Sequence, residues 1–83
     1  MSFAAQLSTH RKRLGLTQAE AAFLLGVGLR TYAGWERDDD PKRRPHLLTQ
    51  EGALARLRDA DKWDVEMIRD QIRLGATEFL RRL

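Results

Sequence analysis

The chain has 83 residues, a formal net charge of +3 at pH 7 and no cysteine. This length is enough for one small domain, and the lack of cysteine excludes disulfide bonds and thiolate zinc sites as means of stabilising it. A domain of this size is only marginally stable by itself, so close helix packing or association with a second copy is expected.

The basic residues are unevenly distributed. Residues 1–46 hold eight basic and five acidic side chains, whereas residues 47–83 hold seven of each kind. An excess of positive charge in one half of the chain indicates a polyanionic partner. The N-terminal sequence lacks the pattern of a signal peptide, and no apolar stretch approaches the ~20 residues of a membrane span. We therefore expect a cytoplasmic protein with no membrane partner.

The first predicted helix begins after Ser2, a good N-cap residue, and ends at Gly15. Its apolar side chains have helical spacing and share one face: Phe3, Leu7 and Leu14. A second helix begins at Thr17, where the sequence T-Q-A-E is a capping box. In this motif the Thr17 hydroxyl and the Glu20 carboxylate each bond the backbone amide of the other residue.

The second helix stops at Gly26, and a third follows at once, from about Gly28 to Arg37. Two short helices joined by a turn of three or four residues that contains glycine predict a helix-turn-helix. Gly26 suits such a turn because a left-handed backbone costs glycine almost nothing.

On a helical wheel the third helix has two distinct sides. Two arginines lie among small residues on one side, which holds Leu29, Ala33, Arg37, Arg30 and Gly34. The opposite side holds Thr31, Trp35, Tyr32 and Glu36, and we expect its aromatic residues to face the core. Because Gly34 lowers helix stability by about 1 kcal/mol relative to alanine, a glycine on the outward side suggests that something approaches the backbone closely. A DNA major groove, about 12 Å wide, accepts a helix in this manner.

The DDDPKRRP segment from Asp38 is a predicted loop, and Pro45 suits the first turn of a fourth helix over about 45–58. The side chains of that helix predicted to face inward are Leu47, Leu54 and Leu57. Asp61 or Asp64 caps a fifth helix that runs toward the C-terminus. No stretch alternates as a strand would, so the sequence predicts an all-α fold of five helices.

The fifth helix has two apolar faces. The broader face holds Val65, Ile68, Ile72, Gly75, Ala76, Phe79, Leu80 and Leu83, and a narrower stripe holds Trp63, Met67 and Leu74. Two faces indicate contacts on both sides, one with the domain and one with a second subunit. We expect the dimer contacts among Val65, Ile68, Ile72, Ala76, Phe79 and Leu83, although these residues could instead close the core of a monomer.

The stretch LTQAEAAFLLGVGLRTYAGWE, from Leu16 to Glu36, resembles the helix-turn-helix of the phage Cro and repressor (Xre-like) family. The resemblance covers roughly residues 3–57 and is most specific in LTQAEAA, LLGV and the closing WE. It implies a compact five-helix, repressor-like DNA-binding domain that acts as a dimer on palindromic double-stranded operators. We accordingly expect a helix-turn-helix domain over residues 1–60, followed by an amphipathic helix over 61–83 that packs on the domain and on a second subunit.

The resemblance also implies roles for individual residues. Gln18 would meet a phosphate or a base edge, and Arg11 with Glu36 would form a structural ion pair between the first and third helices. The implied base readers are Gly28, Leu29, Arg30, Ala33 and Gly34, and the implied backbone contacts are Arg37, Lys42, Arg43 and Arg44. Arg30 could contact a phosphate instead of a base, and the KRR run could be a solvated loop.

The sequence departs from the family pattern in three respects. Gly28 replaces the usual serine or threonine cap, and the reading side lacks the Gln or Asn pair that commonly reads adenine. The three aspartates Asp38–Asp40 would repel phosphate. These departures affect the operator sequence and the affinity more than DNA binding itself.

Two function classes remain open. The first is a dimeric transcription regulator, a repressor of the phage, plasmid or restriction–modification controller type, located in the cytoplasm at the nucleoid. The second is an antitoxin-type interaction module that neutralises a small protein partner (a toxin) and represses its own operon. No nucleophile, cofactor motif or metal-ligand cluster is present, since His10 and His46 lie far apart, so we expect no enzyme activity, no cofactor and no metal.

Overall fold

The computed structural model describes residues 2–37 and 44–82, with side chains described as far as Gly75. The described residues form five helices and no strand: α1 (Phe3–Arg13), α2 (Gln18–Leu25), α3 (Leu29–Arg37), α4 (Leu47–Asp59) and α5 (Lys62–Arg82). The predicted all-α, five-helix fold is confirmed. None of the described helices combines the length and the apolar character that a bilayer-spanning segment needs.

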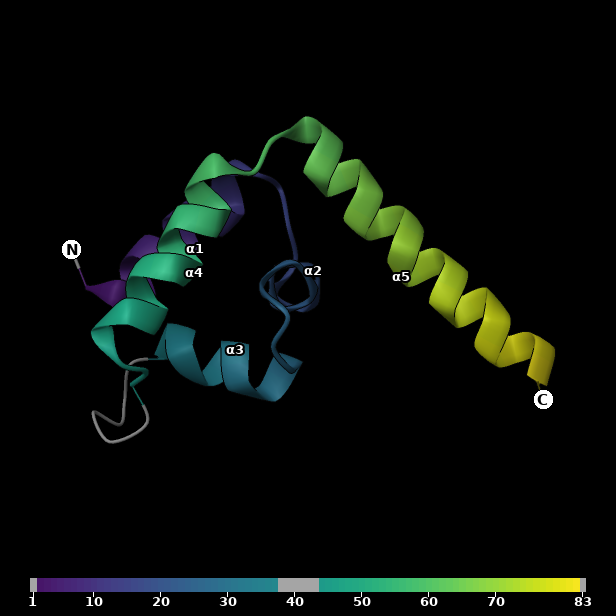
Figure 1. The fold of residues 1–83 in the computed structure, drawn as a ribbon, viewed down its shortest axis with the longest axis horizontal. Coiled ribbons are helices and arrows are strands. Elements are labelled where there is room, and N and C mark those ends of the chain that lie inside the picture. Colours follow the sequence, from purple (N-terminus) through teal and green to yellow (C-terminus); the bar gives the residue numbers. More distant parts are fainter. Residues whose placement is uncertain (1, 38–43, 83) are drawn as a thin grey trace.

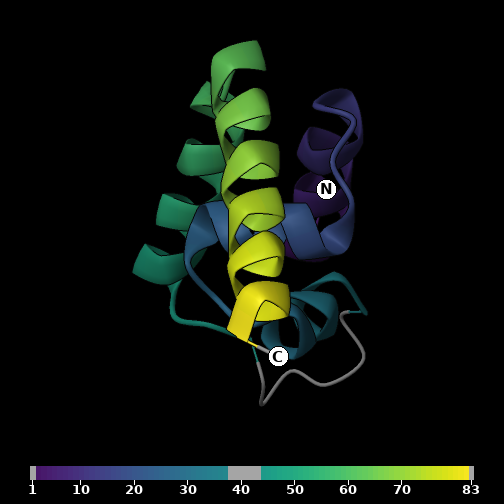
Figure 2. The same cartoon turned by 90° about the vertical axis from the view of Figure 1, so that its right-hand side faces the viewer.

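The first four helices pack around a common centre, and α5 projects from them (Figure 1). α1 and α4 lie against each other, α2 crosses the middle, and α3 lies across the end opposite the last turns of α1 and α4. Figure 2 shows α5 in front of α2, with α1 and α4 on its two sides. α5 contacts α2 near its beginning and then runs diagonally away from the other helices (Figure 1).

The core draws on all five helices. Its buried residues are Leu7, Leu16, Ala21, Ala22, Tyr32, Ala53, Leu57 and Val65, with Phe3, Leu14, Leu24, Leu25, Val27, Trp35 and Leu54 packed around them. Tyr32, Leu7 and Leu57 are the largest of the fully buried side chains. Each such side chain stabilises the fold by roughly 1.5–3 kcal/mol, and alanines in α2 allow the neighbouring helices to approach closely.

The ends of the first two helices are as predicted. The Ser2 hydroxyl accepts a hydrogen bond from the Ala5 amide (3.1 Å) at the start of α1. The capping box of α2 is complete, because the Glu20 amide donates to the Thr17 hydroxyl (3.1 Å) and the Thr17 amide donates to the Glu20 carboxylate (2.9 Å). Reciprocal bonds of this kind satisfy amides that the helix itself leaves unpaired.

The turn between α2 and α3 is built on Gly26, which has φ +72° in the left-handed region. The Val27 amide donates to the Ala22 carbonyl (3.0 Å) and the Gly26 amide to the Phe23 carbonyl (3.1 Å). These two bonds form a Schellman motif, which ends one helix and redirects the chain within a few residues. The predicted role of Gly26 is confirmed.

The fourth helix differs from the prediction at its beginning. α4 starts at Leu47 rather than at Pro45, and Pro45 lies before it, where its carbonyl accepts a hydrogen bond from the Gln50 side chain (2.8 Å). Leu47 was expected to face inward but is 72% exposed, whereas Leu54 is half-buried and Leu57 is buried. The packed side of α4 is centred on Ala53 and Leu57, and Leu47, as the first residue of the helix, lies outside this contact.

The fifth helix begins with a second reciprocal cap. The Asp64 amide donates to the Asp61 carboxylate and the Asp61 amide to the Asp64 carboxylate, both at 3.0 Å. Val65 and Ile68 are buried inside the protomer, so these two of the six expected dimer residues belong to its own core. Ile72 is exposed, and Ala76, Phe79 and Leu83 lie outside the residues whose side chains are described.

Candidate nucleic-acid interface

α3 occupies one end of the molecule and has one buried side (Figures 1 and 2). Tyr32 is 0% exposed and Trp35 is half-buried, packed against Phe3 with ring centroids 5.9 Å apart. The predicted inward orientation of both aromatics is therefore confirmed. Opposite them, Arg30 and Arg37 are exposed, so the arginine-bearing side of α3 faces outward.

The outward side is rotated relative to the helical-wheel prediction. Thr31 was expected to lie with the aromatics, but it is exposed and lies beside Arg30. The buried direction is set by Tyr32 and Glu36, which places Gly34 near the middle of the outward side. Thr31 is thus a surface residue that the sequence interpretation missed. Its hydroxyl in the first turn of α3 was the available signal.

A shallow hollow lies over the outward side of α3. The residues that line it are Arg30, Thr31, Ala33, Gly34, Trp35 and Arg37. A Cβ added to Gly34 would meet no atom within 4 Å, and the φ of Gly34 is not in the left-handed region. Alanine would therefore fit there and favour the helix by about 1 kcal/mol. No contact in the described part of the protein requires a glycine at this position.

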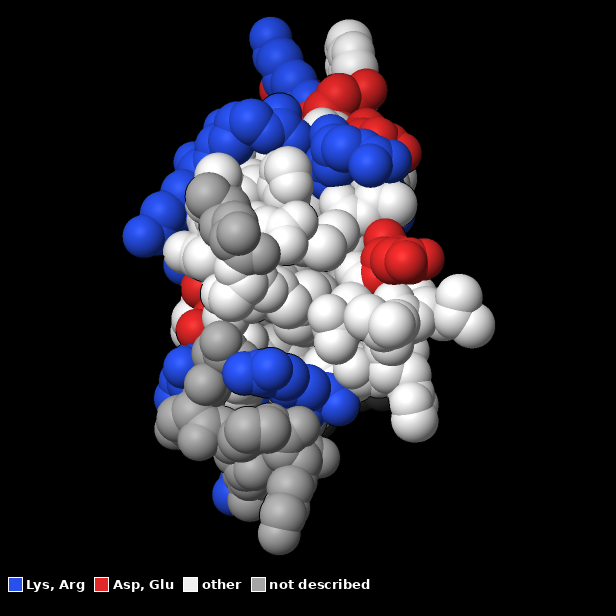
Figure 3. Space-filling view, turned by 90° about the vertical axis from the view of Figure 1, so that its left-hand side faces the viewer, with Lys and Arg blue, Asp and Glu red and all other residues white. Residues whose placement is uncertain are grey.

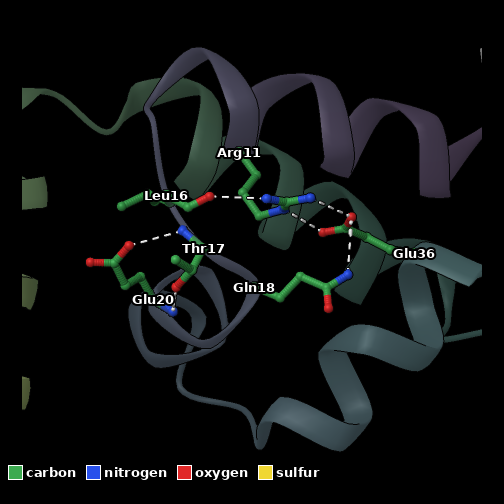
Figure 4. A network of polar contacts seen from close by, with 6 residues as sticks. All are labelled: Arg11, Leu16, Thr17, Gln18, Glu20 and Glu36. Carbon is green, nitrogen blue, oxygen red and sulfur yellow. Dashed lines mark hydrogen bonds and ion pairs between the residues drawn. The ribbon is translucent and has the colours of Figure 1, made fainter.

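A polar network holds α3 from its inner side (Figure 4). Arg11 of α1 donates to both carboxylate oxygens of Glu36 in α3 (2.8 and 3.1 Å) and also to the Leu16 carbonyl (2.9 Å). The ion pair that the resemblance implied is therefore present. Because the side chains of Arg11 and Glu36 are only 15% and 8% exposed, this bidentate ion pair holds α3 against α1.

The network also shifts ionisation. Burial opposes the charge on Glu36 and is the largest single influence on it, but the hydrogen bonds and the positive charge of Arg11, together with the polar groups of Tyr32 and Gln18, outweigh burial and hold the pKa of Glu36 below its ordinary value. The hydrogen bond to Glu36 likewise raises the pKa of Arg11. Burial raises the pKa of Tyr32, whose hydroxyl lies near this pair without a hydrogen bond of standard geometry to any described residue.

Gln18 joins the same network from the first turn of α2. Its side-chain amide donates to a Glu36 oxygen at 3.4 Å, a long hydrogen bond, and its side chain is half-buried (Figure 4). The Gln18 side chain, which is expected to contact DNA, is thus oriented by its hydrogen bond to Glu36 of α3.

The other expected contact residues lie on or near α3. Gly28 and Leu29 are exposed at its beginning, and Ala33 is half-buried on its outward flank. Arg44 is exposed just before α4, whereas Lys42 and Arg43 lie outside the described residues. The expected base readers and Arg37 thus lie on α3 or at its beginning, whereas Gln18 lies in the network on its inner side and Arg44 lies just before α4.

The basic residues of α1 are placed differently. Its last turn carries Lys12 and Arg13 and points to the end of the molecule away from α3 (Figures 1 and 2). Arg13 there donates to the carbonyls of Leu57 and Arg58 at the end of α4 (3.3 and 3.1 Å). Figure 3 shows the face over α1 and α4, with Lys and Arg at its upper end and again in its lower part, and a largely uncharged middle between them. The basic excess of residues 1–46 is thus not all directed toward one partner.

Within the described ranges, no group of three or more His, Cys, Asp or Glu side chains could hold a metal ion. His10 is half-buried in α1, and His46 is the exposed residue that precedes α4.

Comparison with known proteins agrees with the geometry of α2 and α3. A family model described as helix-turn-helix matches residues 7–51, which is more than half of the chain. No curated protein and no solved structure matched the chain significantly. The matched residues include the whole of α2 and α3 and the turn between them.

Proposed function

The chain belongs to the Cro/C1-type helix-turn-helix family of DNA-binding transcriptional regulators, and from this premise we propose that it is a homodimeric repressor. Its operator would be an inverted repeat, of the kind used by phage, plasmid and restriction–modification controllers, and it would act at the nucleoid. The outward side of α3 carries the proposal. Two exposed arginines flank a glycine there whose added Cβ would meet no atom of the described residues within 4 Å.

In the proposed complex α3 lies in the major groove. Arg30 donates to O6 and N7 of a guanine, and Ala33 contacts a thymine methyl group. Gly34 lets the helix backbone approach the base edges, while Gly28 and Leu29 at its beginning complete the reading surface. Contacts to phosphates come from Gln18, Arg37, Lys42, Arg43 and Arg44, and they position the helix without reading sequence.

In the proposed dimer, the two copies contact each other through the part of α5 that follows its buried contact with its own protomer. Val65 and Ile68 already pack inside the protomer, so Ile72, Ala76, Phe79 and Leu83 are the proposed contacts with the second copy. Two copies related by a twofold axis would then present two α3 helices to half-sites about 34 Å apart, or a multiple of that distance. Ile72→Glu should yield a monomer in sedimentation analysis, and a dimer of unchanged stability would reject this contact.

The reading role of Arg30 is tested with operator sequences selected from a random DNA pool. We expect Arg30→Ala to reduce the preference at one base pair of each half-site by about 5- to 150-fold, the range for one good bidentate contact. If Arg30 contacts a phosphate instead, affinity falls equally for all sequences and the slope of log affinity against log salt falls by about one unit. Unchanged sequence preference would remove Arg30 from the reading role.

Lys12→Ala is the matched control. It removes one positive charge from an exposed residue in the last turn of α1, at the end of the molecule away from α3. We expect this variant to keep both the sequence preference and the salt dependence of the unaltered protein. A Lys12 variant that lost as much as the Arg30 variant would indicate that general charge, rather than α3, accounts for DNA binding.

A second candidate function is that of an antitoxin which binds a small protein partner and represses its own operon. It is favoured by the exposed apolar stripe on the outer side of α5, formed by Trp63, Met67 and Leu74. Purification of the native complex separates the two functions. A stoichiometric small protein bound to α5 supports the antitoxin, and a homodimer alone supports the simple repressor.

A further inference from the structure

The contact of α5 with the rest of the protomer is short. Val65 and Ile68 in its first two turns are buried, whereas every residue from Arg69 to Gly75 is exposed. The helix nevertheless continues to Arg82. About 13 residues therefore extend beyond Arg69, a length of about 20 Å at 1.5 Å per residue.

Arg69 lies where the docked part of α5 ends and joins it to two other segments. Its Nε donates to Oε2 of Glu20 in α2 (2.7 Å), and its Nη2 donates to the carbonyl of Gly15 in the turn before α2 (2.8 Å). The second oxygen of Glu20 accepts the Thr17 amide of the capping box. The hydrogen bond from Arg69 holds the pKa of Glu20 below its ordinary value, so the carboxylate is charged at neutral pH.

These bonds restrict the direction of α5 more than they stabilise the fold. Arg69 and Glu20 are 47% and 15% exposed, and ion pairs at such positions contribute little to stability. The guanidinium is planar, however, and two of its nitrogens are held by groups in different segments, which fixes its orientation.

The apolar contact alone leaves this direction poorly defined. Two buried side chains one turn apart form a narrow ridge, about which a helix can rock. A hollow also lies beside the ridge, between α1 and α5, lined by Arg13, Leu14, Lys62, Val65, Glu66 and Arg69. The side of α5 facing α1 is therefore not closely packed. Arg56 of α4 holds the first turn of α5 through Asp64 (3.4 Å), and the two hydrogen bonds of Arg69 are the directional contacts one turn further along the helix.

A small rotation at this point has a large effect at the far end of α5. Tilting a segment of about 20 Å by ~10° moves its tip by about 3.5 Å. This displacement is close to the 3.4 Å rise of one base pair. In a dimer joined through the projecting segment, the direction of α5 thus determines the separation of the two α3 helices.

We propose that Arg69 is a positioning residue that sets the half-site spacing of the operator by fixing the direction of α5 relative to α2. The inference rests on the proposed function, since it requires a dimer joined through α5 and an inverted-repeat operator. Arg69 itself touches no DNA in this proposal.

The first test measures binding to inverted repeats whose half-sites are constant and whose spacer varies one base pair at a time. We expect Arg69→Ala to remain a folded dimer with unchanged half-site preference, but to lose several-fold of the discrimination between the best spacer and its neighbours. Arg69→Lys keeps the charge but cannot make both hydrogen bonds in the same geometry. Its discrimination between spacers should therefore lie between that of the unaltered protein and that of Arg69→Ala. Glu20→Gln supplies a second variant, because glutamine preserves the capping box and removes the charge that Arg69 contacts.

Arg73→Ala is the control for loss of charge from α5. Arg73 pairs with Asp70 in its own helix (3.3 Å) and is more exposed than Arg69. This variant should keep the narrow spacer preference. If Arg69→Ala and Glu20→Gln keep it as well, the proposal is wrong while the dimeric repressor stands. If the unaltered protein selects no inverted repeat, the proposed function and this inference both fall.

The second test needs neither DNA nor a dimer. Because the chain has no cysteine, Lys12→Cys and Glu78→Cys can carry two spin labels, one on α1 and one on the projecting part of α5. Pulsed electron spin resonance on labelled protein diluted in unlabelled protein then reports the distance distribution within one protomer. We expect Arg69→Ala to broaden the distribution by about 2–3 Å, the movement of position 78 for a ~10° tilt. Equal widths with and without Arg69 would overturn the proposal.

Discussion

Breaking the Arg11–Glu36 ion pair by Glu36→Ala should destabilise the protein more than breaking any other ion pair among the described residues. The substitution leaves the Arg11 guanidinium in a part-buried site with the Leu16 carbonyl as its remaining bond, and it removes the acceptor of the Gln18 amide. Removing one partner of a buried pair costs about 3–5 kcal/mol, because the other charge stays desolvated. Since Arg11 is 15% exposed, we expect the lower end, about 3 kcal/mol. A domain of this size has a total stability of about 4–12 kcal/mol, so the loss is a large fraction of it.

Urea denaturation at a fixed protein concentration measures this loss, with the concentration held constant because dimerisation adds to apparent stability. A loss of 3 kcal/mol corresponds to a fall in Tm of roughly 12–24 °C. Arg11→Ala should cost a similar amount, and the double variant little more than either, giving a coupling of about 2–3 kcal/mol. Asp59→Ala is the control, since Arg58 and Asp59 are 63% and 68% exposed and their pair should contribute almost nothing. Strictly additive effects, or a cost below about 1 kcal/mol for Glu36→Ala, would refute this reasoning.

Four further outcomes are expected. Gly26→Ala should lower the free energy of unfolding by about 1–2 kcal/mol, because the backbone of Gly26 has a positive φ. Gly34→Ala should raise the free energy of unfolding by up to about 1 kcal/mol and weaken DNA binding. Thermal melts measure the stability and gel shifts the binding, and a less stable Gly34 variant would contradict the prediction. Tyr32→Phe should change the unfolding free energy by less than about 1 kcal/mol, since the hydroxyl makes no standard hydrogen bond to described residues; a larger loss in urea would show that the hydroxyl is bonded. The pKa values of Glu20 and Glu36 are lowered in the folded state. The stability that these two carboxylates contribute is therefore complete above the unfolded pKa of 4.5 and is lost as the pH falls below it. A urea midpoint that rises on acidification would contradict this sign.

Helix ends could be predicted because their causes are local. Ser2 and Thr17 each accept a hydrogen bond from an amide three residues away, and Gly26 takes a backbone conformation that suits glycine alone. The sequence contains all the groups involved within one turn of helix. The start of α4 was placed less well, because Pro45 fits either the first turn or the position before it, and only packing decides between them.

Which side chains face the core was harder to predict than where the helices lie in the sequence. The helical wheel placed Thr31 on the core side of α3, and Leu47 was predicted to face inward in α4, yet both are exposed. Periodicity defines which residues share a face, but the neighbouring helices decide how far that face is rotated and where it ends. The same limit applies to α5, where the sequence could not show that Ile68 is the last buried residue among those described up to Gly75.

A resemblance to a family predicts a contact between residues distant in sequence only when both residues lie in the stretch that resembles the family. The Arg11–Glu36 pair was expected because both residues lie in the stretch that resembles the family. The bond from Arg69 to Glu20 spans 49 residues and joins the helix-turn-helix to a helix outside the matched residues 7–51. No local pattern marks Arg69 among the seven basic residues of the C-terminal half.

The bond between Arg13 and the end of α4 has a consequence for synthesis on the ribosome. Arg13 precedes its partner Leu57 by 44 residues, and α4 is the helix that packs along α1. At ~5–20 residues per second, translation of that interval takes about 2–9 s. During this time α2 and α3 are synthesised, and the apolar side of α1 around Leu7 lacks the helix that covers it until α4 has been made.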